Sequence, residues 1–348
     1  MASNLQLHSG SPLIGSPIVY KVTAGSPVGD VTFQRVKLRV TAGLSSEGKY
    51  YNFEFSQPVT KGETVYIDIS SALRSVADKY EFSFNAPDSY PYIAFSLEAC
   101  DEYMQNGQNS GDVGKVTNDG GGALMGSFSD LERLKTSRAG RNPTKFTRKP
   151  GTSMEIVFTG STFLRPVPMV ASLGNITNGP RVTKTKIEEE GVQTIWDDDG
   201  HTSGTTVYAV PFPYDGYELR FVNGLGCVES VCVHTLAQEE VKVTTDELVI
   251  ARQQLFNEVS HGLTLKQNDQ ERWKCSSGPL DRAWQQWFLH EFVMTPAAWV
   301  CIDHIWVPCH IIPEESVRGF DRTKGGLLEV QFTIALDIAG SPFADLAI

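Results

Sequence analysis

The feature that most constrains the fold is a two-residue alternation of apolar and polar side chains, which recurs in short runs. Residues 35–40 read Arg-Val-Lys-Leu-Arg-Val, and residues 51–56 read Tyr-Asn-Phe-Glu-Phe-Ser. Successive side chains of a β-strand lie on opposite faces, so each run predicts a strand with one buried and one solvent-facing side. Strand-like runs separated by glycine, proline and serine occupy residues 18–23, 32–40, 50–55, 64–69, 80–84 and 92–99.

We therefore expect a mostly β protein with two antiparallel β-sandwich-like domains and a small α+β C-terminal domain. The first domain covers residues 1–105, in which Ser70–Val76 predicts one or two helical turns, capped by a serine, that close one end of the sandwich. Residues 106–152 form a loop that is first glycine-rich and then basic, with one short helix. The second sandwich-like domain covers residues 153–250, and the C-terminal domain, with a Trp-rich helix and a hairpin, covers residues 251–348.

The charge and hydropathy of the chain argue against several classes of partner. Its 348 residues carry a net charge of -11. Nucleic acids and anionic membrane surfaces attract proteins with a basic excess, so we expect no nucleic acid as a partner. No segment offers about 18 consecutive apolar residues, which predicts no membrane insertion, and the first residues do not form a secretory signal. We expect synthesis in a cytoplasm, where the six cysteines stay as free buried thiols.

Tryptophan is concentrated near the C-terminus, where four of the six lie between Trp284 and Trp306. Residues 279–293 carry apolar side chains at helical spacing, and Trp284 and Trp287 are among them. Tryptophans at such spacing more often belong to a core than to an interface. The pattern therefore predicts a helix that packs its two tryptophans into the core of the C-terminal domain.

An apolar hairpin follows the helix, with its turn near Asp303 and His304, and a long strand is predicted at residues 327–338. Trp299 and Trp306 lie on the hairpin arms. Tryptophan is enriched at protein contacts, so Trp299 and Trp306 are our candidate interface residues here.

The later half of residues 106–152 is strongly basic. Its basic residues are Arg133, Lys135, Arg138, Arg141, Lys145, Arg148 and Lys149. A solvated loop is the favoured interpretation of such a run, and docking with an acidic partner is the alternative. For that alternative, Arg138 and Arg141 are the candidate interface residues.

Residues that could carry chemistry do not fall into a catalytic or metal-binding arrangement. Cys301, His304, Cys309 and His310 supply a possible metal quartet, but the two cysteines lie on opposite arms of the hairpin and adjacent strand residues face opposite ways. The sequence contains no phosphate-binding glycine motif, serine nucleophile elbow or zinc-binding helix motif. We therefore predict no catalytic residue, no metal site and no cofactor. A carboxylate pair for glycan hydrolysis stays open, since such pairs are recognised only in space.

Four stretches share a pattern with one group of proteins. Gly62–Ser75 is a strand that leads into a Ser-Ser-x-Leu-Arg turn, and Gly126–Arg133 is a short helix after a glycine-rich loop. Tyr217–Val231 has the form aromatic-x-Asn-x-x-Gly-x-aromatic-acid-Ser, with cysteine and valine where the aromatic is usual. Leu280–Ile312, followed by Leu327–Leu336, joins a Trp-containing helix to strands with a Val-Pro-x-x-Ile pattern. Together these stretches resemble an uncharacterised family of tail-associated virion structural proteins of Bacteroidales phages and prophages.

The resemblance covers most of the chain and implies a structural component of a phage tail or tail-like injection assembly, such as a baseplate part. Such a component acts through protein-protein contacts in a symmetric homo-oligomer. Its expected partners are copies of itself and other virion tail proteins, and its expected location is the virion tail, after assembly in the host cytoplasm. The alternative is a carbohydrate- or receptor-binding module of the tail, with a host surface glycan as partner, and a glycan hydrolase is the third interpretation. The resemblance carries over no catalytic residue.

Overall fold

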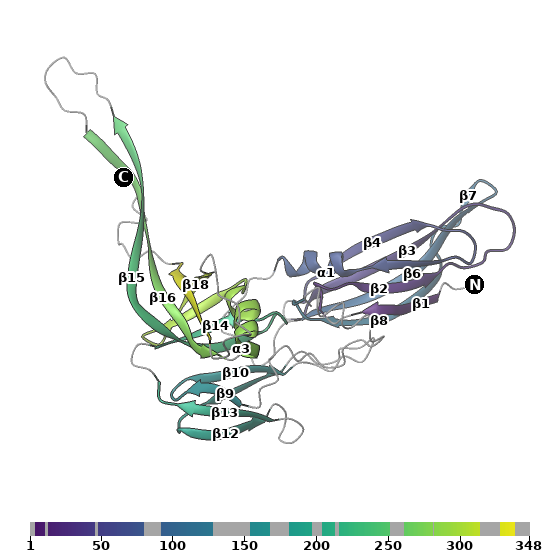
Figure 1. Ribbon diagram of the computed structural model, residues 1–348. Coiled ribbons are helices and arrows are strands. Elements are labelled where there is room, and N and C mark those ends of the chain that lie inside the picture. The colour runs from purple at the N-terminus through teal and green to yellow at the C-terminus, as the bar shows by residue number, and fades with distance from the viewer. Residues whose placement is uncertain are drawn as a thin grey trace, which may run out of the picture.

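The computed structural model describes residues 4–10, 13–45, 48–79, 92–127, 154–167, 181–196, 204–212, 216–250, 261–280, 282–313 and 328–337. The described chain is mostly β, as the alternation predicts, with several sheets and a small helical part near the C-terminus. Its parts are an N-terminal unit, a small unit of two short sheets, and a barrel from which a long hairpin projects (Figure 1).

Two sheets share the core of the N-terminal unit. One has the order β1-β2-β5, and the other has the order β4-β3-β6, with β7 and β8 both paired to β6. The elements are β1 (Asn4–Gly10), β2 (Ile18–Thr23), β3 (Val31–Leu44), β4 (Tyr50–Pro58), β5 (Thr64–Asp68), α1 (Ser70–Ala77), β6 (Ile93–Gln105), β7 (Gln108–Asn109) and β8 (Val113–Ala123). Tyr20 and Val22 from the first sheet enter the same core as Val36, Leu38 and Val40 from the second.

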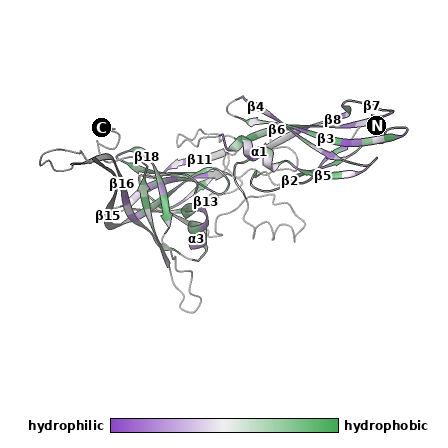
Figure 2. Ribbon diagram, turned by 90° about the horizontal axis from the view of Figure 1, so that it is seen from above, coloured by the Kyte–Doolittle hydropathy of each residue, from purple (hydrophilic) through white to green (hydrophobic). Residues whose placement is uncertain are grey.

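Five of the six predicted strands in this unit correspond to β2, β3, β4, β5 and β6, and the predicted strand 80–84 lies outside the described residues. Figure 2 shows hydrophilic and hydrophobic residues alternating along these strands. The basic residues of the 35–40 run lie on the outer face of β3, while its apolar residues are fully buried.

Helix α1 forms where helical turns were predicted, and it buries Leu73 and Val76 against β3 and β6. The predicted serine cap is wrong, because no side chain caps the helix start at Ile69. Instead, the Asp68 carboxylate accepts hydrogen bonds from the backbone N–H groups of Ser70 at 2.9 Å and Ile18 at 3.0 Å. One aspartate thus joins the start of the helix to the first sheet.

The small unit consists of the three-stranded sheet β12-β13-β9 and the pair β10-β11. Its strands are β9 (Met154–Phe158), β10 (Thr162–Val167), β11 (Arg181–Lys186), β12 (Gly191–Trp196) and β13 (Gly204–Val210). Val157, Phe163, Ile187, Ile195 and Val207 form a shared core.

The C-terminal half is a closed six-stranded barrel in the order β14-β15-β16-β19-β18-β17. Its elements are β14 (Gly216–Val222), β15 (Val228–Ile250), β16 (His261–Leu280), α3 (Arg282–Trp287), the π-helix η1 (Phe288–Val293), β17 (Ala298–Ile302), β18 (Ile305–Pro313) and β19 (Leu328–Leu336). The predicted helix 279–293 is shorter than expected, because Leu280 still belongs to β16. The predicted hairpin and last strand are confirmed, and the hairpin turns at Asp303 and His304 with φ of 47° and 66°.

The strand pairing divides the chain differently from the predicted boundaries. β8 extends the N-terminal unit to Ala123, well past residue 105. The predicted boundary at residue 250 separates β15 from β16, although both are neighbouring strands of one barrel. The barrel thus combines segments that were assigned to two domains.

β15 and β16 extend well beyond the residues that pair with the other strands of the barrel. β14 pairs with β15 only as far as His234, and β19 pairs with β16 only from Arg272 onward. Residues 241–250 and 261–271 pair with each other and, among the described residues, with no third strand. We call this two-stranded ribbon the arm. A strand of this length spans roughly 40 Å, and Figure 1 shows the arm extending away from the barrel.

Candidate interaction surfaces

Trp299 lies in a small core where all three parts of the chain meet. This junction core contains Leu13 and Leu124 from the N-terminal unit, Leu164 from β10, and Val222 and Trp299 from the barrel. The Trp299 side chain is only 6% exposed. Trp299 was predicted to contact another protein, and this prediction is corrected. The Trp299 side chain instead holds parts of one chain together, because residues of β10 and of the N-terminal unit cover it.

Backbone segments approach closely beside the junction core. The N–H of Ser127 donates to the Gly224 carbonyl at 3.0 Å. A Cβ atom on Gly126 would lie 2.2 Å from that same carbonyl oxygen, so only glycine fits at this crossing. The connection between the N-terminal unit and the barrel is therefore a tight backbone contact.

Asn223 organises the loop between β14 and β15. Its side-chain carbonyl accepts hydrogen bonds from the N–H groups of Leu225 and Cys227, both at 3.0 Å, and its amide donates to the buried Glu229 carboxylate at 3.1 Å. Gly226 adopts a positive φ of 81° in the same loop. The Asn, Gly and acid positions of the Tyr217–Val231 motif therefore have structural roles in a turn.

Trp306 of β18 is half-buried and packs against the edge of the junction core. The Arg220 guanidinium lies over its ring, 4.1 Å from the centroid, in a cation-π contact. Part of this ring remains accessible, so the structure leaves Trp306 as a candidate contact residue. Arg138 and Arg141, the other two candidates, lie outside the described residues.

Both helix tryptophans, Trp284 and Trp287, pack in the barrel core, as predicted. Trp287 is 7% exposed, and Trp284 packs against it edge to face with ring centroids 5.1 Å apart. In η1, Phe292 is fully buried and contacts Phe332 of β19 with centroids 5.3 Å apart. Together α3 and η1 place an aromatic cluster against the barrel interior.

The cysteines are free thiols, as predicted. Burial raises the pKa of Cys227, Cys232, Cys275 and Cys309 to about 12 each, so these thiols stay protonated near neutral pH. In the described part of the chain, no three His, Cys, Asp or Glu side chains gather closely enough to hold a metal ion. His310 contacts Asp337 at 3.1 Å and is exposed, whereas its neighbour Cys309 is buried.

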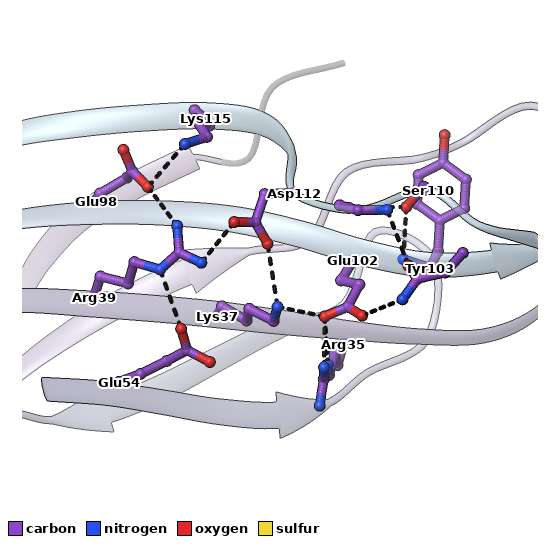
Figure 3. Close-up of polar contacts among 12 residues, drawn as sticks. Arg35, Lys37, Arg39, Glu54, Glu98, Glu102, Tyr103, Ser110, Asp112 and Lys115 are labelled. Atoms are coloured by element: carbon purple, nitrogen blue, oxygen red, sulfur yellow. Dashed lines mark hydrogen bonds and ion pairs between the residues drawn. The ribbon is translucent and has the colours of Figure 1, made fainter.

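An ion-pair network covers the outer face of β3, β6 and β8 (Figure 3). Lys37 contacts Glu102 at 2.5 Å and Asp112 at 3.1 Å, and Arg39 contacts Asp112 at 2.6 Å. Arg35, Glu54, Glu98 and Lys115 extend the network. The network therefore contains four basic and four acidic side chains, and its net charge is zero. We expect this face to attract charged ligands only weakly.

The network shifts the pKa values of its acids downward. Hydrogen bonds from Lys37, Asn109 and Arg35 lower the pKa of Glu102 to about 2. Hydrogen bonds from Arg39 and Lys37 also lower the pKa of Asp112. The side chains of Lys37 and Glu102 are only 12% and 11% exposed, so this pair is shielded more than an ordinary surface ion pair.

One apolar surface was missed by sequence reasoning. Val192 and Tyr208 are cross-strand partners on β12 and β13, and they are 61% and 44% exposed. Trp196, on the same face of β12, is 50% exposed. The two-residue spacing of Val192, Thr194 and Trp196 indicates that they share one face of β12. The opposite face carries the apolar Ile195, so the sequence does not show which of the two faces is buried.

No known family model matches the chain, and no curated protein is significantly similar to it. Within the described residues, none of the helices has the length and apolar character needed to span a bilayer.

Proposed function

We propose that the protein is a structural component of a phage tail or tail-like injection assembly, acting without catalysis through protein-protein contacts in a symmetric oligomer. Its partners would be further copies and other tail proteins, and a baseplate is one position that suits it. In this proposal, the N-terminal unit and the small unit are both β-sandwich-like domains.

The arm is the observation that carries the proposal. An isolated two-stranded hairpin is at best marginally stable in water, because it has no third strand or helix to share a core. Within the described residues, no other strand pairs with the outer edges of the arm. Such open edges usually attract another strand or are covered by a neighbour. An arm of roughly 40 Å is therefore best explained by a neighbouring subunit that holds it.

Electron microscopy of the purified chain tests the proposal. We expect closed particles of uniform symmetry, since contacts repeated around an axis close into rings. The same chain, added to tail particles that lack it, should join them at one position. A chain that stays monomeric at high concentration and joins no particle would contradict a structural role.

The exposed face of Val192, Trp196 and Tyr208 supports a second candidate, a carbohydrate-binding module. Aromatic faces suit the apolar side of a sugar ring, and the flanking Thr194 and Thr206 could supply hydroxyl groups for hydrogen bonds. If this candidate is right, purified host surface glycan should quench tryptophan fluorescence, and Trp196→Ala should abolish the quenching. Identical quenching in wild type and variant would remove the support that this face gives.

A further inference from the structure

A hollow lies at one end of the N-terminal unit, between the β2–β3 connection, the start of β3 and the β4–β5 connection. The last pair between β3 and β4 is Arg35 with Pro58, so β3 continues through residues 31–34 without pairing to β4, and the hollow occupies this place. Its volume is about 520 Å³, and small-molecule sites typically have roughly 300–1,000 Å³. We call it the tip hollow. Figure 1 shows that this end of the unit, next to β7, points away from the barrel.

The β2–β3 connection, which forms one wall of the tip hollow, is held in place by side chains of β3 and β6. The buried Asp101 carboxylate accepts a hydrogen bond from the Gly25 N–H at 2.9 Å, and the buried Gln34 amide donates to the Gly25 carbonyl at 2.9 Å. Further along, the Gln105 amide donates to the Val28 carbonyl at 2.7 Å. This wall is therefore ordered before a ligand binds, which lowers the entropy that binding must cost.

The β4–β5 connection forms the opposite wall and is held by its own hydrogen bonds. The Glu63 carboxylate accepts from the N–H of Thr60 at 2.6 Å and from its hydroxyl at 2.8 Å. These bonds lower the pKa of Glu63, so its carboxylate stays charged at neutral pH. The N–H of Gly62 donates to the Gly25 carbonyl at 3.3 Å, which ties the two walls together.

The lining of the tip hollow combines an apolar face with charged and hydroxyl groups. Phe33 supplies an aromatic ring, and its side chain is 42% exposed. The other apolar lining residues are Val31, Pro58 and Val59, and the polar ones are Asp30, Thr32, Thr60, Lys61 and Glu63. Two carboxylates against one ammonium group disfavour an anionic ligand, and the polar groups disfavour a wholly apolar ligand.

A neutral sugar has the chemistry that this lining requires. The C–H groups on one side of a sugar ring are apolar and suit an aromatic ring, while its hydroxyl groups both donate and accept hydrogen bonds. Carboxylates accept from hydroxyl groups, and a lysine ammonium group donates to them. Phe33, Asp30, Glu63 and Lys61 provide these three kinds of contact around one space.

We propose that the tip hollow is a binding site for a neutral sugar. The Phe33 ring covers the apolar side of the sugar, Asp30 and Glu63 accept hydrogen bonds from its hydroxyl groups, and Lys61 donates to a sugar oxygen. The site lies in a different unit from the exposed face of β12 and β13. It also lies within one chain, so it goes beyond the proposed function and does not depend on oligomer formation.

Nuclear magnetic resonance of valine methyl groups in the full chain tests the proposal without any variant. The probes are the methyl glycosides of glucose, galactose, mannose and N-acetylglucosamine, with that of glucuronic acid as the anionic comparison. At least one neutral probe should shift the Val31 and Val59 resonances saturably and leave Val192 of β12 unchanged. No saturable shift at Val31 and Val59 with any neutral probe, or a shift with the glucuronide alone, would overturn the proposal.

A matched pair of variants then tests the aromatic contact. Phe33→Ala should weaken binding of the active probe about tenfold, because the sugar loses its aromatic partner. Tyr50→Ala is the control and should bind as wild type does, since Tyr50 is a 59% exposed aromatic residue at the other end of β4. Equal affinity of Phe33→Ala and wild type would contradict the assigned role of Phe33.

The outcomes also separate this proposal from the other two. A monomeric chain that binds the probe at Val31 and Val59 supports the sugar site and contradicts the structural oligomer, while an oligomer that binds no probe does the reverse. A probe that shifts Val192 alone supports the β12–β13 face as the sugar site and overturns the tip hollow.

Discussion

Trp299 and Trp306 show how two tryptophans on one hairpin acquire different roles. Trp299 is enclosed by side chains from the N-terminal unit and β10, while Trp306 lies half-exposed under Arg220. Their spacing in the sequence indicates a shared hairpin. It does not reveal what covers each face, because the covering residues Leu13, Leu124 and Leu164 are distant along the chain.

We predict that Trp299→Ala lowers the free energy of unfolding by about 3–5 kcal/mol, because it leaves a cavity in the junction core. Trp306→Ala is the matched control, with a smaller expected loss, since its ring is already partly solvated. Denaturant unfolding of both variants measures the difference. Equal losses would contradict the placement of Trp299 at the junction.

At the scale of the element, the ion-pair network on β3, β6 and β8 makes stability depend on acidic pH. The folded pKa of Glu102 is lowered from an ordinary value of 4.5 to about 2. A carboxylate with a lowered folded pKa contributes stability above its unfolded pKa, and this contribution is lost as pH falls through the folded pKa. Wild type should therefore lose stability between about pH 4.5 and pH 2.

We predict that Glu102→Gln is less stable than wild type at neutral pH and that the difference shrinks as the pH is lowered through this range. Thermal unfolding at a series of pH values measures it. Glu188→Gln is the control, because Glu188 pairs with Lys186 and both side chains are more than 60% exposed, at 70% and 64%. A constant difference between wild type and Glu102→Gln at all pH values would show that the Glu102 charge is not responsible.

The sequence predicted β2 to β6 and the C-terminal hairpin, because each has one buried face that leaves a two-residue alternation. It did not predict β1, and it assigned β7 and β8 to the loop 106–152. It did not predict the arm. Residues 266–271 read Lys-Gln-Asn-Asp-Gln-Glu, which carries no apolar alternation because the ribbon covers no core of its own. The same alternation could not identify Val192, Trp196 and Tyr208 as an exposed patch, since strand periodicity gives two faces without saying which is buried.

At the scale of the whole molecule, the barrel was not predicted because its closure depends on pairings between distant segments. Leu219 of β14 pairs with Val300 of β17, and Trp273 of β16 pairs with Ile334 of β19. Local patterns specify each strand, but they do not specify these partners. The same long-range pairing places the predicted boundary at residue 250 between two neighbouring strands of one barrel.

The arm connects the architecture to the proposed assembly, and its removal is the most direct test of the account. Val241 and Glu271 are cross-strand partners, so residues 242–270 can be replaced by Asn-Gly, which favours a tight two-residue hairpin turn. The barrel core lies outside the deleted residues, and an unchanged near-ultraviolet circular dichroism spectrum of the barrel aromatics serves as the folding control.

Sedimentation velocity of wild type and the arm-deleted chain, over a range of concentrations, is the measurement. We predict an oligomer for wild type and a folded monomer for the arm-deleted chain. An arm-deleted chain that is folded and still forms the wild-type oligomer would contradict assembly through the arm.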